Sequence, residues 1–141
     1  MKDFEILLYY KYVPIADPQA LLVSQRRLCE DLGFKGRIII ASEGINGTVE
    51  GKKESTQKYI DEMRKNPQFA DIHWKRSVGT GEAFPRLSIK VRKEIVSGHL
   101  DEEDVKPWEV TGKRLKPEEL YKWLKSGKKL TIVDMRNDYE Y

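Results

Sequence analysis

The stretch from Ala41 to Gly51 (ASEGINGTVEG) restricts the fold of this chain more than any other. An apolar run, residues 37–41, leads into it, and a second short strand, residues 45–51, leads out. Glycine and asparagine tolerate the backbone conformations that tight turns require. The pattern predicts a hairpin in which Gly47 lies where another group approaches the backbone closely. The residues assigned this structural role are Glu43, Gly44, Asn46 and Gly47. Alternatively, the glycines are needed only so that the chain can turn, and the hairpin has no further role.

The elements around this hairpin can be read from hydrophobic spacing. Residues 4–13 are apolar on both faces, which predicts a central strand that is largely covered on both sides. Asp17-Pro18 predicts the start of a helix, because Asp caps free N–H groups and Pro suits the first helical position. Gly33 predicts its end. A second helix is predicted for residues 54–66 and a strand for residues 72–76.

The predicted order of residues 1–78 is therefore βαββαβ. This is the ferredoxin-like split βαβ arrangement of the α+β class. It consists of an antiparallel sheet with two helices that cover the same face. The opposite face of the sheet is left open for use.

A further strand, residues 86–93, alternates basic and apolar side chains. Its apolar residues are expected to face inward, and its basic residues then share the outer face. Lys and Arg at regular intervals can neutralise a nucleic-acid backbone. The candidate RNA-binding residues on and around this strand are Arg37, Lys75, Arg86, Lys90 and Arg92. An edge strand that is protected by charge against aggregation explains the pattern equally well.

Charge and cysteine content narrow the class of protein. Residues 1–100 hold 17 Lys and Arg against 13 Asp and Glu, an excess that permits a polyanionic partner without requiring one. The single cysteine, Cys29, fits a reducing compartment, so the cytoplasm is the expected location. We expect a buried, inert thiol there. No signal peptide, membrane span or metal ligand is expected, and His73 has no companion at metal-binding spacing.

The last third of the chain predicts a change of fold. Residues 97–112, with an acidic run at 101–104, resemble a linker. A short helix near Pro117 and an apolar strand at 130–136 then open a parallel α/β unit, which needs further strands to cover it. We therefore expect one domain at 1–96 and an incomplete second one at 113–141, within a longer native chain.

Five segments together resemble the rhodanese-domain tRNA uridine hydroxylase family. They are LYYKY at 8–12, GRI at 36–38, EGINGTV at 43–49, KVRKEIV at 90–96 and DMRNDYE at 134–140. The similarity runs along the whole chain, and the hairpin motif with its distance from the others makes it specific. The resemblance implies an N-terminal acylphosphatase-like ferredoxin domain followed by the start of a rhodanese domain.

The same resemblance implies oxygen-dependent 5-hydroxylation of the wobble uridine of certain tRNAs. Molecular oxygen would be the co-substrate, no other cofactor is evident, and the partners would be tRNA and the rhodanese half of the same protein. The working cysteine of that family lies in a rhodanese loop that would follow Tyr141, and no residue here matches it. No catalytic residue is therefore assigned, and the 141-residue chain by itself is expected to be inactive.

Three other functions compete. An acylphosphatase-type hydrolase needs an anion-cradling loop with an Arg after the first strand, and residues 13–16 (VPIA) contain neither Arg nor Gly. The other glycine-rich turn, Gly79-Thr80-Gly81, does not qualify as a phosphate loop either, because it lacks the Lys and the strand context that such a loop has. A rhodanese sulfurtransferase and a purely structural module that packs on the rhodanese half remain as alternatives.

Overall fold

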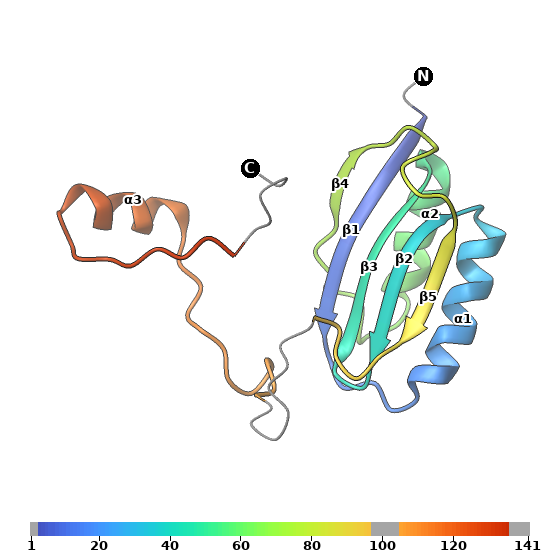
Figure 1. Ribbon diagram of the computed structural model, residues 1–141, viewed down its shortest axis with the longest axis horizontal. Coiled ribbons are helices and arrows are strands. Elements are labelled where there is room, and N and C mark those ends of the chain that lie inside the picture. The colour runs from blue at the N-terminus through green and yellow to red at the C-terminus, as the bar shows by residue number, and fades with distance from the viewer. Residues whose placement is uncertain (1–2, 97–104, 136–141) are drawn as a thin grey trace. The chain divides into compact units, whose positions relative to one another are not determined.

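The computed structural model describes residues 3–96 and 105–135 (Figure 1). The chain divides into two compact units, Met1–Val110 and Thr111–Tyr141. The predicted acidic run at 101–104 lies outside the described residues.

The larger unit follows the predicted βαββαβ order and adds one strand. Its elements are β1 (Phe4–Tyr12), α1 (Pro18–Asp31), β2 (Lys35–Ala41), β3 (Gly44–Lys52), α2 (Lys53–Arg64), β4 (Lys75–Val78) and β5 (Leu87–Val91). The strands form one sheet in the order β4-β1-β3-β2-β5. The first four pair antiparallel, as predicted, whereas β5 pairs parallel with β2. The sheet is therefore mixed, and β5 extends the β2 edge.

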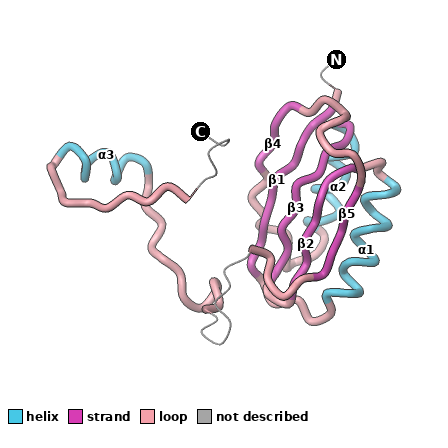
Figure 2. Tube along the Cα trace, viewed as in Figure 1, coloured by secondary structure: helices cyan, strands magenta, loops and turns pink. Residues whose placement is uncertain are grey.

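Both helices lie on the same face of the sheet (Figures 1 and 2). The Asp17 side chain caps α1 by accepting a hydrogen bond from the Ala20 N–H at 3.0 Å, and Gly33 ends it with φ +70°. The predicted inward residues of α2 are all buried: Thr56, Tyr59, Ile60 and Met63. They meet the sheet side chains Leu7, Tyr9, Ile38, Ile40, Ile45, Val49 and Ile89 in a single core. Burial of this apolar surface stabilises the unit.

A chain of hydrogen bonds crosses this core. The hydroxyls of Tyr9 and Tyr59 bond to each other, and the Tyr59 hydroxyl donates to Gln25 Oε1 at 2.6 Å. Burial raises the pKa of both tyrosines, so both stay protonated near neutral pH. Burial also raises the pKa of the Cys29 thiol to about 12. The thiol is completely buried in this core, in agreement with the inert role predicted for it.

Two predictions about the strands of the larger unit were wrong in detail. The first strand is covered on one face, whereas its other face is open at Leu8 and Tyr10, which are 42% and 54% exposed. The reason is that both helices pack on the Leu7 and Tyr9 face. The strand predicted at 72–76 is β4 at 75–78 instead, because pairing with residues 5–8 of β1 fixes its register.

The smaller unit contains the predicted helix, α3 (Pro117–Lys125). The Lys116 N–H donates to the Glu119 carboxylate at 3.2 Å at its start, and the Lys128 ammonium lies 3.7 Å from the centre of the Trp123 ring after its end. Residues 130–135 are irregular and not the predicted strand. A strand requires a hydrogen-bonded neighbour, and the described part of this unit supplies none. Among the described residues, no helix is both long and apolar enough to cross a membrane.

Candidate nucleic-acid interface

The face of the sheet opposite the helices carries aligned rows of side chains. Pairing registers define one row across all five strands: Lys75, Leu8, Thr48, Arg37 and Ser88. The next row contains Tyr10, Asn46, Ile39 and Lys90. Because side chains alternate between the faces of a strand, these residues share the helix-free face. We call this surface the open face. It combines exposed apolar and aromatic groups on β1 with cations on β2 and β5.

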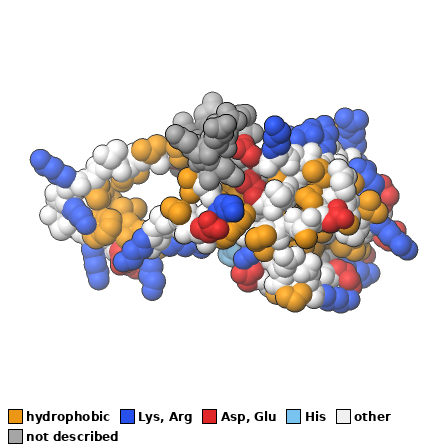
Figure 3. Space-filling model, turned by 90° about the horizontal axis from the view of Figure 1, so that it is seen from below, with side chains coloured by type: hydrophobic (Ala, Val, Ile, Leu, Met, Phe, Trp, Pro, Cys, Tyr) orange, Lys and Arg blue, Asp and Glu red, His pale blue; other side chains and the backbone are white. Residues whose placement is uncertain are grey.

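Four of the five candidate RNA-binding residues lie at one side of the open face. Arg37 belongs to β2, Lys90 to the neighbouring β5, and Arg86 and Arg92 flank β5. All four are exposed, and none forms an ion pair with another residue in ranges 3–96 and 105–135. Lys and Arg side chains gather at the upper right of Figure 3. This side of the sheet is therefore positively charged, and within the described residues no carboxylate pairs with these four cations.

The fifth candidate, Lys75, is on the opposite side of the sheet. It pairs with Leu8 on β1, so β1 and β3 separate it from Arg37. Three strand spacings amount to roughly 14 Å. The prediction that Lys75 extends the β5 cluster therefore does not match the strand order, which places β4 and β5 at opposite edges.

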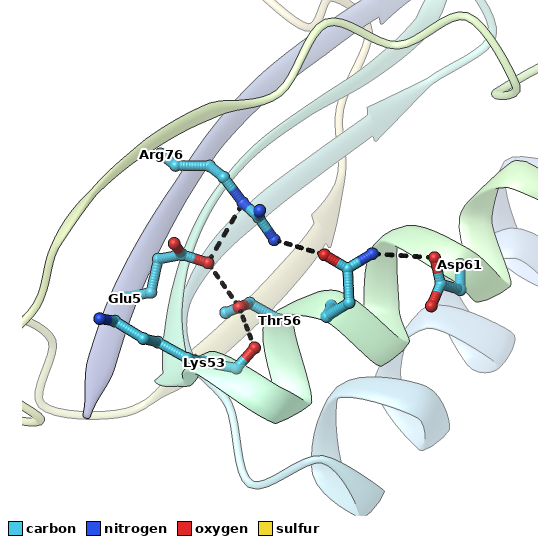
Figure 4. Close-up of polar contacts among 6 residues, drawn as sticks. Glu5, Lys53, Thr56, Asp61 and Arg76 are labelled. Carbon is cyan, nitrogen blue, oxygen red and sulfur yellow. Dashed lines mark hydrogen bonds and ion pairs between the residues drawn. The ribbon is translucent and has the colours of Figure 1, made fainter.

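The other cation of β4 points to the helix face and is already neutralised (Figure 4). The Arg76 guanidinium lies 3.3 Å from the Glu5 carboxylate and donates to Gln57 Oε1 at 2.8 Å. Thr56 donates to the same Glu5 oxygen at 2.6 Å. Arg76 therefore joins β1, β4 and α2, and it is not part of the open face.

One end of the open face is closed by the connector before β5, which is held by a buried carboxylate. Glu50 is 2% exposed. Its Oε1 accepts from the N–H groups of Thr80 at 2.7 Å and Gly81 at 2.8 Å, and its Oε2 accepts from Ala83 at 2.9 Å. The Gly79-Thr80-Gly81 turn thus cradles an anion from its own chain. Sequence reasoning missed this role of Glu50, although a turn rich in glycine signals backbone N–H groups that can face an acceptor.

The predicted hairpin closes the other end. Ser42 and Glu43 join the last pair of β2 and β3, Ala41 with Gly44. Glu43 Oε1 accepts from the N–H of Ile95 at 2.7 Å, and the Asn46 amide donates to the carbonyl of Ile95 at 3.0 Å. The two side chains therefore clamp both polar backbone groups of a buried residue beyond β5. Sequence alone could not identify this contact, because the partners are about fifty residues apart.

The hairpin glycines have neighbours that explain them. A Cβ atom on Gly47 would overlap the ring of Tyr9, and one on Gly44, whose φ is +151°, would overlap the carbonyl oxygen of Lys11. The close approach at Gly47 therefore comes from an aromatic ring of the core.

The carboxylates of Glu43 and Glu94 lie near Tyr12, the last residue of β1, beside this hairpin. The pKa of Tyr12 is raised, first by its partial burial and then by the charge of Glu43, with smaller effects of Tyr10 and Glu94. A phosphate would be repelled there, so the potential across the open face favours an anion on the β2 and β5 side.

The loop after β1 does not offer an acylphosphatase-type anion cradle. The Val13 N–H donates to the Glu43 carbonyl at 2.9 Å and the Ile15 N–H donates to the Ser42 carbonyl at 2.8 Å. Pro14 has no N–H group. The amides that would bind phosphate in this loop are therefore used by the hairpin.

The topology of the larger unit defines an α+β protein with an acylphosphatase-like ferredoxin fold. The model of the UPF0176 acylphosphatase like domain matches residues 4–95, and the chain belongs to this family.

Solved structures with a similar fold include BlrB, a BLUF protein in its dark state, which is 22% identical with a TM-score of 0.56. The match covers 90% of this chain and 98% of that chain. Another is Klebsiella pneumoniae BlrP1 with FMN and cyclic diGMP, which is 19% identical with a TM-score of 0.54. The match covers 87% of this chain and 35% of that chain. At these identities the likeness shows the fold alone.

Curated relatives match almost the whole chain. A protein of Bacillus pumilus named tRNA uridine(34) hydroxylase is 44% identical over 140 residues, which are 99% of this chain and 43% of the relative. A protein of the same name from Listeria welshimeri is 45% identical over 141 residues, which are 100% of this chain and 44% of the relative. The chain thus spans less than half the length of these relatives.

Proposed function

We propose that this chain is the N-terminal portion of a tRNA-modifying enzyme, a tRNA uridine hydroxylase, and that its open face binds and positions tRNA. The observation that carries the proposal is a cluster of cations on β2 and on or beside β5 that form no ion pair within the described part of the chain: Arg37, Arg86, Lys90 and Arg92. Phosphate contacts of this kind fix the register of an RNA without reading its sequence. The name shared by the relatives supports tRNA as the polyanion.

The chemical step in this proposal is the oxygen-dependent hydroxylation of the wobble uridine at C5, with molecular oxygen as co-substrate. The catalytic groups would lie in the part of the protein that corresponds to the other half of the relatives, with a rhodanese fold, and the present chain would supply RNA binding. Residues 113–141 would begin that second domain. The expected location is the cytoplasm.

Charge reversal on the open face tests the proposal. The full-length protein with Arg37→Glu and Lys90→Glu is expected to bind tRNA about ten-fold more weakly. Because two phosphate contacts are lost, the slope of the logarithm of the binding constant against the logarithm of the salt concentration should become shallower by about 2. The matched control is Arg27→Glu with Lys58→Glu, two exposed cations on the helices that cover the other face. Both proteins change net charge by the same amount. Equal losses in the two, with folding intact, would reject the open face as the binding surface.

A structural module of a rhodanese sulfurtransferase is the second candidate. The exposed Leu8 and Tyr10 favour it, because apolar side chains on an open sheet face can pack on another domain. In that case charge reversal would leave tRNA binding unchanged and would lower the stability of the full-length protein only.

A further inference from the structure

Beyond the cations, the open face carries an exposed aromatic side chain that packs against a second ring. Tyr10 is 54% exposed, although it belongs to the second strand of a five-stranded sheet. Its ring centre lies 6.2 Å from that of Tyr12 at an interplanar angle of 73°. This edge-to-face contact holds one ring against the other. Tyr10 therefore presents an aromatic surface to solvent, and its contact with the Tyr12 ring favours this orientation.

The surroundings of Tyr10 suit a nucleobase. Leu8 precedes it on the same face, and the row of Leu8 continues through Thr48 and Arg37 to Ser88 on β5. From β1 to β5 the row spans three strand spacings, roughly 14 Å. A short unpaired RNA segment across the sheet can therefore place its phosphates at the cations of β2 and β5 and a base over Tyr10.

We propose that Tyr10 is a stacking platform for an unpaired base, so that the open face selects single-stranded RNA over duplex. This inference rests on the proposed function and adds the form of RNA that is bound. In a duplex each base is stacked on its neighbours, so only unpaired bases can reach an aromatic side chain on a sheet. The cations supply affinity for any RNA, and the tyrosine supplies the preference.

The test measures the affinity of the 141-residue chain for a short single-stranded oligoribonucleotide and for a duplex of the same length by fluorescence anisotropy. Tyr10→Ala is expected to weaken single-strand binding by roughly ten-fold, since one stacked base contributes about 1–3 kcal/mol. Duplex binding and the salt slope should stay unchanged, because no phosphate contact is removed. Tyr10→Phe keeps the ring and should restore the affinity. The matched control is Tyr121→Ala, which removes a 61% exposed ring from α3.

The outcomes separate this inference from the proposed function. If Arg37→Glu with Lys90→Glu weakens binding but Tyr10→Ala does not, the stacking role is overturned and the RNA-binding face stands. If Tyr10→Ala weakens duplex and single strand equally, the selectivity is overturned. If the unsubstituted chain binds neither RNA, both proposals fail. A loss of stability with Tyr10→Ala in the full-length protein, without a change in RNA affinity, would assign the ring to packing within the protein and overturn the inference.

Discussion

The replacement Glu50→Gln tests whether the carboxylate cradle holds the end of the open face. In the native protein one oxygen accepts from Thr80 and Gly81 and the other accepts from Ala83. A glutamine keeps one oxygen, but its amide group then faces the Ala83 N–H, and two donors cannot bond. Hydrogen bonds to a charged acceptor contribute about 1.5–3 kcal/mol each, against about 1 kcal/mol for a neutral one.

These values give the size of the effect. The two bonds that remain lose roughly 1 kcal/mol each, and the lost third bond, which also has a charged acceptor, costs about 2 kcal/mol more. Relief from burying a charge offsets part of this loss, because Glu50 is 2% exposed. We therefore expect the free energy of unfolding to fall by about 2 kcal/mol. With a urea dependence of about 1–3 kcal/mol per molar, the unfolding midpoint should fall by roughly 1 M.

Urea unfolding followed by far-ultraviolet circular dichroism measures this shift. The control is Glu82→Gln, an exposed carboxylate in the same connector, and it should leave the midpoint unchanged. A loss below about 0.5 kcal/mol for Glu50→Gln, or equal shifts in the two variants, would refute the reasoning, since surface substitutions usually stay within that range.

Three further predictions concern the core. Gly47→Ala should destabilise the protein by more than about 2 kcal/mol in thermal unfolding, because its Cβ would overlap the Tyr9 ring. The control Gly112→Ala, which has open space around it, should leave the unfolding temperature unchanged. Tyr59→Phe should cost about 1–3 kcal/mol in urea unfolding, because it leaves the Gln25 oxygen without its donor, and a value near zero would contradict a buried hydrogen bond. The stability should fall as pH rises above about 9, since the unfolded Cys29 thiol ionises there and the folded one, with its pKa raised to about 12, does not. Cys29→Ala should make this fall shallower in unfolding measurements across the alkaline range, and an identical profile would argue against a buried, protonated thiol.

Local spacing was sufficient for most of the fold. The cap at Asp17, the stop at Gly33 and the inward face of α2 depend on neighbours within a few residues, and the structure contains all three. The strand predicted at 72–76 failed by three residues because its position depends on pairing with β1, which lies more than sixty residues away in sequence. The strand predicted at 130–136 failed for a related reason, since an apolar run becomes a strand only beside a partner.

The candidate site shows the same division. Alternation along residues 86–93 predicts that Arg86, Lys90 and Arg92 share one face, because the side-chain period of a strand is a local property. Nothing local indicates that Arg37 joins them while Lys75 does not, since that follows from the strand order β4-β1-β3-β2-β5.

Backbone geometry and hydrophobic period over short distances account for the helices, for the order of the elements in the larger unit and for the glycines at which the chain must turn. The assembled fold was needed to show which side chains share the open face, that Glu50 holds the connector before β5, and that Glu43 and Asn46 clamp Ile95. Each of these contacts joins residues thirty or more positions apart. Their pairing depends on how the strands assemble into a sheet, and no local pattern encodes that assembly.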